Sequence, residues 1–498
     1  MNYIGISCGF HDAALSVVDD TGNILFAGHS ERYSKDKHTK HLSIDLIDDA
    51  ISYIKNRHQV EVHYYERPLM KFLRQLRSGE GTKIANLSAK NIIGKGFLHK
   101  LQDGLGGKIY THNHHLSHAA AGFQTSPFED ATIVVIDAIG EFDTISIWDA
   151  KYINGKAVYN KLWGRKYPDS IGLFYSAMTK RVGLRPLDEE YILMGMAAYG
   201  DSKYYPELHR EVLMDSSQLR FKYNLHAGVS EDYLMGADDM DIAASSQLLV
   251  EQLICNVMKH AKIRGRSKNL VYSGGVALNC LANRLLGKYF DNIWIMPNPG
   301  DAGSSLGAAA LGYGGKLNWV NSYLGTDISG PYPVNKLLDK LLSDGIVGVA
   351  SGRAEFGPRA LGNRSLLADP RGKDIKDKVN QIKRRQKFRP FAPVILEEYV
   401  HQYFNMPVNW RDNRYMQVVA TCRDPDLFPA IVHHDGSSRV QTVAKDGSGI
   451  REVLEKWYVL TGCPMLLNTS LNIRGEPMVN DRIDANRFEK LYDIRVLS

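Results

Sequence analysis

The chain has 498 residues, and 61 Lys and Arg against 55 Asp and Glu give it a net charge of +6 with neutral histidines. Its 44% hydrophobic, 10% aromatic and 23% charged residues are typical of a globular protein with sizeable cores, which excludes collagen-like, disordered and disulfide-scaffold proteins. The length favours about two to four domains.

Hydropathy and cysteine use indicate the compartment. No segment of the sequence resembles a membrane span or a secretory signal. The five cysteines are scattered and odd in number, which favours reduced thiols over a disulfide framework. We therefore expect a cytoplasmic protein without a membrane partner.

The first residues predict strands joined by tight turns. Residues 2–7 are apolar and β-prone, residues 8–12 form a turn that contains Gly9, and strand patterns follow at 13–18 and 23–27. A glycine-containing turn of this kind can bring backbone N–H groups against a phosphate.

A basic stretch follows at residues 64–108. It holds nine Lys and Arg against three Asp and Glu, an excess of six that equals the net charge of the whole chain. Such a stretch is usually a solvated helical face. It is also compatible with a surface for a polyanionic partner, on which four aromatic side chains could stack against bases: Tyr64, Tyr65, Phe72 and Phe97.

Three strand-and-loop units predict an α/β domain. Residues 131–136 are a continuous apolar run that ends in Asp137; a strand at 270–272 leads through Gly274-Gly275 into a helix pattern up to Leu286; and a strand at 293–296 leads into an Ala-rich helix over 302–311. Glycines between strand and helix allow a nucleotide phosphate to approach the backbone, although tight turns with close packing explain them equally well.

A Gly-, Pro-, Asn- and Ser-rich stretch at residues 312–334 predicts a domain boundary. We therefore expect a first domain over residues 1–330 and a second over 331–498, which opens with a strand pattern at 345–350.

His114 and His118 predict a metal site. On a helix, their spacing of four places both imidazoles on one face, where they can clamp an ion. Such a pair is often incidental, but Asp137 ends a strand and Asp301 precedes a helix, at positions where α/β folds build sites. Two imidazoles and two carboxylates suit Fe(II), Mn(II) or Zn(II). Asp301 could instead be a plain helix N-cap.

The segment from residue 353 to 393 is dense in cations placed beside rigid Gly-Pro and Arg-Pro turns. Guanidinium groups held in this way suit phosphate clamping, whereas charge alone would indicate a solvated helix. With the polar turns at 435–441 and 468–472, the cations of residues 353–389 predict a site for a triphosphate and a small acid.

Taken in order, these segments resemble the carbamoyltransferase family of NodU, CmcH and TobZ over nearly the whole chain. The resemblance rests on His11-Asp12, His114-His115-x-x-His118, Gly274-Gly275-Val276-Ala277-Leu278-Asn279-Cys280, Pro299-Gly300-Asp301-x-Gly303 and the stretches 355–365, 388–393, 439–442 and 467–472. It implies an α/β protein with an N-terminal ASKHA domain (the actin-like ATPase fold, also found in tRNA threonylcarbamoyladenosine transferases) and a C-terminal YrdC-like α+β domain.

The resemblance also implies a reaction. The C-terminal domain would convert carbamoyl phosphate and ATP, with Mg²⁺, into carbamoyl-adenylate. The N-terminal domain would hold this intermediate with Fe(II) or another divalent metal while an acceptor hydroxyl attacks the carbamoyl carbon. Adenylation supplies a better leaving group, and a metal acts as a Lewis acid on the intermediate.

The roles implied for individual residues fall into three groups. The metal ligands would be His114, His118, Asp137 and Asp301. The carbamoyl-phosphate and ATP site would contain Lys383, Arg359, Arg439 and Ser470. Adenylate contacts would come from Gly274, Gly275 and Asn279, and we further expect Gly303, Asn472 and His11 to bind cosubstrates.

Two positions depart from the family pattern. Ala138 stands where the family usually has glycine, and Ile192 stands where it commonly has lysine, which puts an acceptor contact of that lysine in doubt. Glu190 is a candidate base for the acceptor hydroxyl, although an ordinary carboxylate is a weak base.

The acceptor hydroxyl could belong to a nucleic acid or to a small molecule. The basic stretch tilts our expectation towards 5-hydroxymethylcytosine or a related pyrimidine in DNA, modified by a virus-encoded enzyme in a host cytoplasm, with the base flipped out of the duplex. The alternatives are a small-molecule hydroxyl (antibiotic, nucleoside or sugar), tRNA threonylcarbamoylation in one chain, or a non-catalytic nucleic-acid-binding protein on this scaffold.

Overall fold

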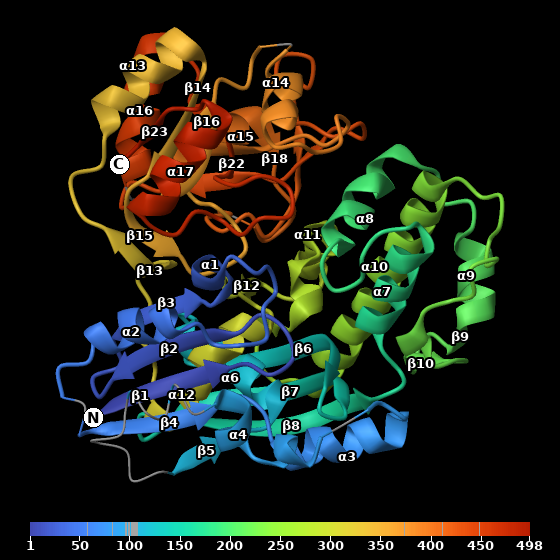
Figure 1. Ribbon diagram of the computed structural model, residues 1–498. Coiled ribbons are helices and arrows are strands. Elements are labelled where there is room, and N and C mark those ends of the chain that lie inside the picture. The colour runs from blue at the N-terminus through green and yellow to red at the C-terminus, as the bar shows by residue number, and fades with distance from the viewer. Residues whose placement is uncertain are drawn as a thin grey trace. The chain divides into compact units, whose positions relative to one another are not determined.

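The computed structural model describes residues 1–56, 58–81, 83–94, 97, 100, 108–372, 374–410, 412–447 and 449–498. These residues form two compact α/β units: Met1–Ser30 with His38–Val320, and Glu31–Lys37 with Asn321–Ser498 (Figure 1). The division falls before the strand at Tyr323–Ile328, ten residues ahead of the expected boundary, and the second unit includes a short N-terminal segment. None of the described helices is long and apolar enough to cross a membrane.

The first sheet of the first unit has five strands in the order β3-β2-β1-β4-β5. Strand β1 is antiparallel to β2, which is antiparallel to β3, whereas β4 runs parallel to β1 and β5 parallel to β4. The bounds are β1 Asn2–Ser7, β2 Ala14–Asp19, β3 Ile24–His29, β4 Val60–Tyr64 and β5 Ile109–Thr111. The strands predicted at the start of the chain are therefore confirmed.

The second sheet repeats this topology strand for strand. Its order is β12-β11-β6-β7-β8, in which β6 is antiparallel to β7, β7 is antiparallel to β8, and β11 and β12 run parallel to β6. The bounds are β6 Asp130–Gly140, β7 Asp143–Ile153, β8 Lys156–Lys166, β11 Asn269–Ser273 and β12 Asn292–Trp294. Two sheets with this shared order define the expected ASKHA-type fold.

Two helices lie between these sheets and bring the ends of distant segments together. Helix α12, Ser304–Tyr313, packs on β1 and β2, and α6, His114–Thr125, packs on β6 and β11 and against α12. The approach is close: a Cβ on Gly5 would lie 1.8 Å from the Ser305 carbonyl oxygen, and one on Gly307 would lie 1.9 Å from that of Ser117. Only glycine fits at either position.

The remaining helices of the first unit are arranged around these layers (Figure 1). Their bounds are α2 Ile44–Ser52, α3 Pro68–Ser78, α4 Ala89–Ile93, α7 Ile171–Arg181, α8 Glu190–Met196, α9 Tyr205–Val212, α10 Asp239–Arg264 and α11 Cys280–Asn283. A small sheet pairs β9 Leu213–Asp215 with β10 Arg220–Phe221.

The predicted helix after Gly274-Gly275 is wrong as one continuous element. The chain forms a 3-10 turn over Gly275–Leu278, then α11, then a further 3-10 turn over Leu286–Lys288. Asn279 interrupts the helix because its side chain accepts a hydrogen bond from the Ala282 N–H and so begins α11 anew.

The second unit is built on a six-stranded mixed sheet in the order β21-β17-β22-β16-β14-β23. One core, centred on Trp457, lies between this sheet and helices α13 and α16, and a second contains side chains of α14, α15 and α17. The helices are α1 Glu31–Ser34, α13 Val334–Asp344, α14 Ile375–Ile382, α15 Val400–Tyr403, α16 Gly449–Thr461 and α17 Arg482–Tyr492. The sheet strands are β14 Ile346–Ala350, β16 Arg364–Ala368, β17 Ala392–Leu396, β21 Gln441–Val443, β22 Met465–Ser470 and β23 Val496–Leu497.

Two short sheets complete this unit. One pairs β13 Tyr323–Ile328 with β15 Gly352–Glu355, and the other has β18 Phe404–Asn405, β19 Ala420–Cys422 and β20 Ser437–Ser438.

The expectation that all cations of residues 353–389 bind phosphate is wrong for two of them. Arg364 is fully buried and donates to five backbone carbonyls, those of Asn480, Ser351, Gly352, Asn363 and Thr326. Arg353 donates to the carbonyls of Leu324 and Gly325. Both guanidinium groups therefore join strands and loops of the second unit.

We expect Arg364→Ala to destabilise the second unit by about 3 kcal/mol or more, because it leaves several buried carbonyls without a donor. Urea unfolding of the full chain measures this loss. Arg371→Ala is the matched control: its half-exposed guanidinium pairs with Asp369, and its loss costs about 1 kcal/mol or less. Equal effects of the two substitutions would contradict the structural role of Arg364.

Candidate metal centre and carbamoyl site

The two histidines predicted to share a helical face do so. Helix α6 begins at His114, its N-cap Asn113 accepts from the Leu116 N–H at 3.0 Å, and the Glu141 carboxylate accepts from the His114 N–H at 3.3 Å. Both imidazoles are buried. The helix and the common face of His114 and His118 are therefore confirmed.

The two carboxylates come from a strand and from a turn that are far apart in the sequence. Asp137 lies in β6, where its Oδ1 accepts from the Gly275 N–H at 3.3 Å. Asp301 begins a 3-10 turn, Asp301–Gly303, that leads into α12. Among the described residues, no side chain caps that turn; the Asp301 carboxylate instead faces the histidines. The N-cap alternative for Asp301 is therefore wrong.

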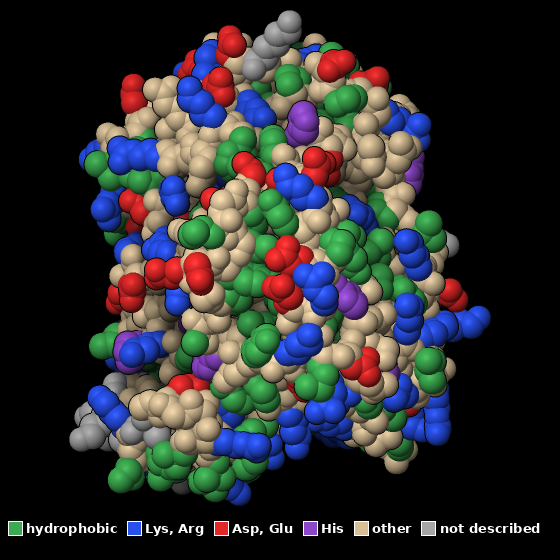
Figure 2. Space-filling view, turned by 90° about the vertical axis from the view of Figure 1, so that its right-hand side faces the viewer, with side chains coloured by type: hydrophobic (Ala, Val, Ile, Leu, Met, Phe, Trp, Pro, Cys, Tyr) green, Lys and Arg blue, Asp and Glu red, His purple; other side chains and the backbone are tan. Residues whose placement is uncertain are grey.

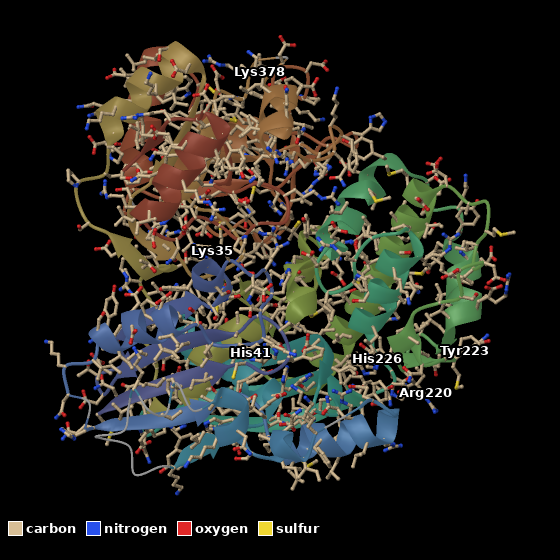
Figure 3. The ribbon with its side chains drawn as sticks, in the orientation of Figure 1. Lys35, His41, Arg220, Tyr223, His226 and Lys378 are labelled. Atoms are coloured by element: carbon tan, nitrogen blue, oxygen red, sulfur yellow. The ribbon has the colours of Figure 1, made fainter. Side chains whose placement is uncertain are left out.

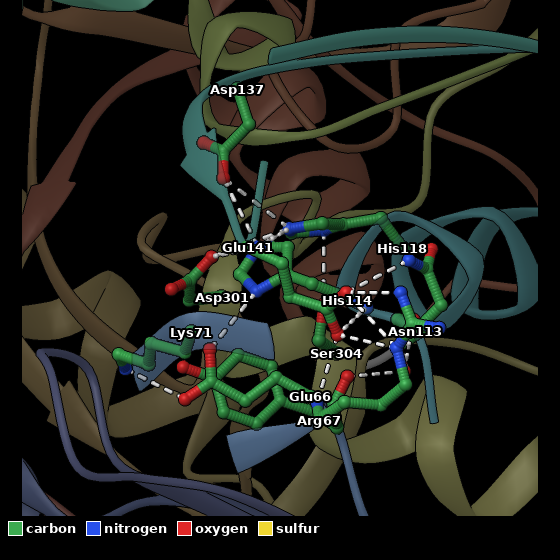
Figure 4. Close-up of polar contacts among 12 residues, drawn as sticks. Glu66, Arg67, Lys71, Asn113, His114, His118, Asp137, Glu141, Asp301 and Ser304 are labelled. Atoms are coloured by element: carbon green, nitrogen blue, oxygen red, sulfur yellow. Dashed lines mark hydrogen bonds and ion pairs between the residues drawn. The ribbon is translucent and has the colours of Figure 1, made fainter. Parts of the chain in front are cut away.

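The four side chains converge on one point (Figure 4). The Nε2 atoms of His114 and His118 are 3.1 Å apart, and they lie 3.2 and 3.8 Å from an Asp137 oxygen and 3.4 and 3.3 Å from an Asp301 oxygen. One ligand atom from each residue lies within 4.8 Å of every other. Although burial raises the pKa of Asp301, the facing His114 and His118 hold it below its ordinary value.

The far sides of the imidazoles are also oriented. His118 Nδ1 lies 3.0 Å from the Ser304 hydroxyl, and His114 Nδ1 lies 3.6 Å from the buried Glu66 carboxylate, which accepts from Lys71 Nζ at 2.6 Å (Figure 4). Metal-bound histidines commonly present their second nitrogen to a carboxylate or another polar partner. The donor set and its surroundings thus fit a divalent metal. Neither Glu66, which follows β4, nor Ser304, the first residue of α12, belongs to one of the sequence motifs described above.

His11 lies beside this cluster. Its Nδ1 is 2.8 Å from Asp12 Oδ2 and its Nε2 is 3.8 Å from Asp301 Oδ2. The turn between β1 and β2, which carries His11, therefore lies next to the metal-ligand candidate Asp301.

The other residues expected in this unit have protein partners of their own. A Cβ on Gly274 would lie 2.2 Å from the Ile136 carbonyl oxygen and one on Gly303 1.7 Å from that of Asn298, so close packing accounts for both glycines. The Asn279 amide pairs with that of Gln247 in both directions at 3.0 Å.

Glu190, the candidate base, begins α8. Its carboxylate accepts from the Ser176 hydroxyl and the Leu187 N–H, both at 2.7 Å. Of the two departures from the family pattern, Ile192 is buried in α8, whereas Ala138 lies in β6 with its backbone 2.8 Å from the position of a Cβ on Gly172.

In the second unit, Lys383, Ser470 and Asn472 form one hydrogen-bonded cluster. Lys383 follows α14, and its Nζ donates to the Ser470 carbonyl at 2.5 Å, the Ser470 hydroxyl at 3.0 Å and Asn472 Oδ1 at 2.6 Å. Burial and then the charges of Arg385 and Arg389 lower the pKa of Lys383 well below its ordinary value. An anionic ligand would offset these neighbouring charges and favour the protonated form of Lys383.

The two remaining candidates, Arg359 and Arg439, are half-buried. Arg439 Nε is buried without a hydrogen-bond partner among the described residues. Burial, and to a smaller extent the charge of Arg439, lower the pKa of His433 to about 4.

The basic stretch does not form the expected stacking surface. Tyr64, Tyr65 and Phe97 are buried, so the prediction that they stack on bases is wrong. Four of the cations are paired with carboxylates: Lys71 with Glu66, Arg67 with Glu141, Arg74 with Glu80 and Lys100 with Asp48. Lys95 lies outside the described residues. On the face drawn in Figure 2, Lys and Arg are interspersed with Asp and Glu over most of the surface.

The duplicated sheets give the first unit an ASKHA-type fold, and the four converging side chains between them are a candidate divalent-metal site. The sequence profile of the carbamoyltransferase N-terminus matches residues 2–310, and that of the carbamoyltransferase C-terminus matches residues 338–498. The chain therefore belongs to the carbamoyltransferase family of the NodU and NolO type and is a carbamoyltransferase.

Relatives support this assignment over most of the chain. An uncharacterized protein, sll1178 of Synechocystis, is 34% identical over 97% of this chain and 93% of its own length. Nodulation protein NolNO of Sinorhizobium fredii is 30% identical over 95% of this chain and 76% of its own. Among solved structures, the activator of 2-hydroxyisocaproyl-CoA dehydratase from Clostridium difficile matches 63% of this chain and 94% of its own chain. The sequence identity is 16% and the TM-score is 0.35. The fold assignment rests on strand order, not on that distant likeness.

We expect Gly140→Ala to weaken divalent-metal binding about tenfold, because outer-shell changes around metal ligands have effects of this size. A Cβ at Gly140 would lie 2.4 Å from the His114 ring and 2.6 Å from that of His115, so the ligand ring has to move. Titration with Co(II) measures the affinity. Gly81→Ala, where a Cβ meets nothing within 4 Å, is the control and leaves the affinity unchanged.

Proposed function

We propose that this carbamoyltransferase makes carbamoyl-adenylate from carbamoyl phosphate and ATP in its second unit and transfers the carbamoyl group to an acceptor hydroxyl in its first unit. The observation that carries the proposal is the presence of two differently built clusters. One is a buried set of two imidazoles and two carboxylates; the other is a buried lysine with hydroxyl and amide partners among arginines.

The second cluster is suited to activation. Water would cleave phosphate from carbamoyl phosphate, and an oxygen of the resulting carbamate would attack the α-phosphorus of ATP, with pyrophosphate as the leaving group. Lys383, Arg359 and Arg439 would neutralise the phosphate charge, a role for which preorganised cations are well suited. Ser470 and Asn472 hold the Lys383 ammonium group in place. Bound Mg²⁺ would share the charge of the ATP phosphates.

The first cluster is suited to transfer. The acceptor hydroxyl oxygen would attack the carbamoyl carbon, AMP would leave and the hydroxyl proton would be released. His114, His118, Asp137 and Asp301 would hold Fe(II) or another divalent ion, which supplies Lewis-acid polarisation when bound. Ser304 contacts His118 Nδ1, and the Glu66 carboxylate faces His114 Nδ1 at 3.6 Å. The Gly275 N–H donates to Asp137, and Gly274 and Gly303 allow close packing of the backbone next to the two ligand segments.

For the acceptor, we now favour a hydroxyl on a small molecule over hydroxymethylated DNA. The preference for DNA rested on the basic stretch and its aromatic side chains. Three of those four aromatics lie in the core, and four of the cations have carboxylate partners. The features that could have stacked on bases are thus used for packing and ion pairing.

We expect Lys383→Ala to abolish the release of pyrophosphate from ATP and carbamoyl phosphate. His114→Ala should leave that release intact and block transfer, because it alters only the first unit. Lys378→Ala is the matched control and keeps both steps, because Lys378 is an exposed lysine of α14, the helix that ends just before Lys383 (Figure 3). If the metal-loaded wild-type protein releases no pyrophosphate, the proposed activity is refuted. If both variants lose only transfer, the assignment of the two steps to the two units is refuted.

The acceptor class is tested by mass spectrometry after reaction with ATP and carbamoyl phosphate. We expect a sugar or aminoglycoside hydroxyl to gain the mass that corresponds to replacement of hydrogen by CONH₂, and DNA containing 5-hydroxymethylcytosine to remain unmodified. The reverse result would restore DNA as the acceptor.

A further inference from the structure

His38 connects two segments of the first unit that are far apart in sequence. Its Nδ1 lies 2.7 Å from Asp12 Oδ1, and its Nε2 lies 3.0 Å from Asp188 Oδ1. Each ring nitrogen of one imidazole thus faces a carboxylate oxygen, and an imidazolium donates to both at once. Its side chain is 30% exposed, so solvent reaches the edge of this arrangement.

The Asp12 carboxylate extends the connection to the metal-ligand candidates. Its second oxygen, Oδ2, lies 2.8 Å from His11 Nδ1, and His11 Nε2 lies 3.8 Å from Asp301 Oδ2. Asp12 has a φ of +52°, a left-handed conformation that aspartate tolerates better than most residues. The backbone at this turn is therefore set in a conformation in which one carboxylate lies between two imidazoles.

The other end of the connection reaches α8. Asp188 Oδ2 pairs with Arg185 Nη2 at 2.7 Å, and Asp188 lies two residues before Glu190, the first residue of α8. His38 therefore joins the turn that carries His11 to the loop that leads into the helix of the candidate base Glu190.

We propose that His38 is a positioning residue for the carbamoyl-transfer site: by bridging Asp12 and Asp188 it fixes the His11 imidazole against the metal-ligand candidate Asp301. The proposal rests on the proposed function in one respect, the assignment of His11 and Asp301 to the transfer site. His38 itself lies three carboxylate–imidazole contacts away from Asp301, by way of Asp12 and His11.

The physical reason is the orientation of Asp12. With both imidazoles in place, its two oxygens have separate partners, and the carboxylate plane is fixed. Without His38, one oxygen loses its partner and the carboxylate is free to rotate, which releases His11 from its orientation. Removal of a residue that hydrogen-bonds directly to a metal ligand commonly changes metal affinity 10–100-fold, and His38 acts on Asp301 through Asp12 and His11, so its effect belongs at the low end of that range.

The experiment compares Co(II) affinity, measured by titration of the full chain. We expect His38→Ala to weaken binding about tenfold, at the low end of the range for indirect partners. His260→Ala is the matched control: this half-buried histidine of the same unit stacks on Trp163 and contacts the Ser217 carbonyl, and its loss should leave Co(II) affinity unchanged. Equal affinity of His38→Ala and wild type would overturn the proposal.

Two further comparisons separate positioning from a general loss of structure. Asn at position 12 tolerates the positive φ but has only one acceptor oxygen. In the Asp12→Asn background, His38→Ala should therefore reduce Co(II) affinity little further. If the losses of Co(II) affinity of the two single variants add in full, the proposal is overturned. Asp188→Asn keeps an oxygen opposite His38 Nε2 and should bind Co(II) better than Asp188→Ala, whereas equal losses would count against the bridge.

A second readout does not need metal. In protein labelled at histidine Cε1, the His11 resonance, identified by its loss in His11→Gln, should shift in His38→Ala and stay in place in His260→Ala. An unmoved His11 resonance would overturn the positioning role of His38, whether or not the protein binds Co(II). Absence of Co(II) binding by the wild-type protein would instead refute the proposed metal site. Absence of pyrophosphate release from wild type would refute the proposed activity independently of either measurement.

Discussion

The arrangement of the first unit depends on one electrostatic constraint, the burial of two carboxylates and two imidazoles at one point. An isolated buried carboxylate is strongly unfavourable, and Asp137 and Asp301 are both buried near each other. Their charges are offset by His114 and His118, which have to come from a third element. The metal candidate site therefore requires that β6, α6 and the turn before α12 meet with little freedom of position.

The packing of α6 on α12 meets this requirement. The two helices approach through Gly307, and α12 approaches β1 through Gly5. These contacts are local, but they determine where Asp301 stands relative to the start of α6. Ser304, one turn further on, reaches His118 from the same helix. A larger side chain at either glycine would push α12 away from β1 or α6 and so separate the metal-ligand candidates. This explains why glycine lies in the interior of β1 and of α12.

Much of this arrangement could be predicted from the sequence because it depends on local patterns. Runs of apolar, β-prone residues predict β1, β2 and β6, and a spacing of four predicts the shared face of His114 and His118. Predictions failed where tertiary partners decide the outcome. Arg364 looks like a phosphate-binding cation, yet five carbonyls from distant loops surround it. Tyr64 and Tyr65 look like surface aromatics in a basic stretch, yet they close the core beside β4.

The bridge at His38 shows the same limit for function. Nothing in the spacing of residues 12, 38 and 188 indicates a contact, because the last two are separated by 150 positions. His38 is the first residue of the first unit after the segment Glu31–Lys37, which belongs to the second unit. Within that unit, the buried Arg32 donates to the Gly357 carbonyl at 3.0 Å. His38 thus contacts two carboxylates of the first unit. One of them, Asp12, also contacts His11, so the orientation of the His11 ring depends on the position of His38.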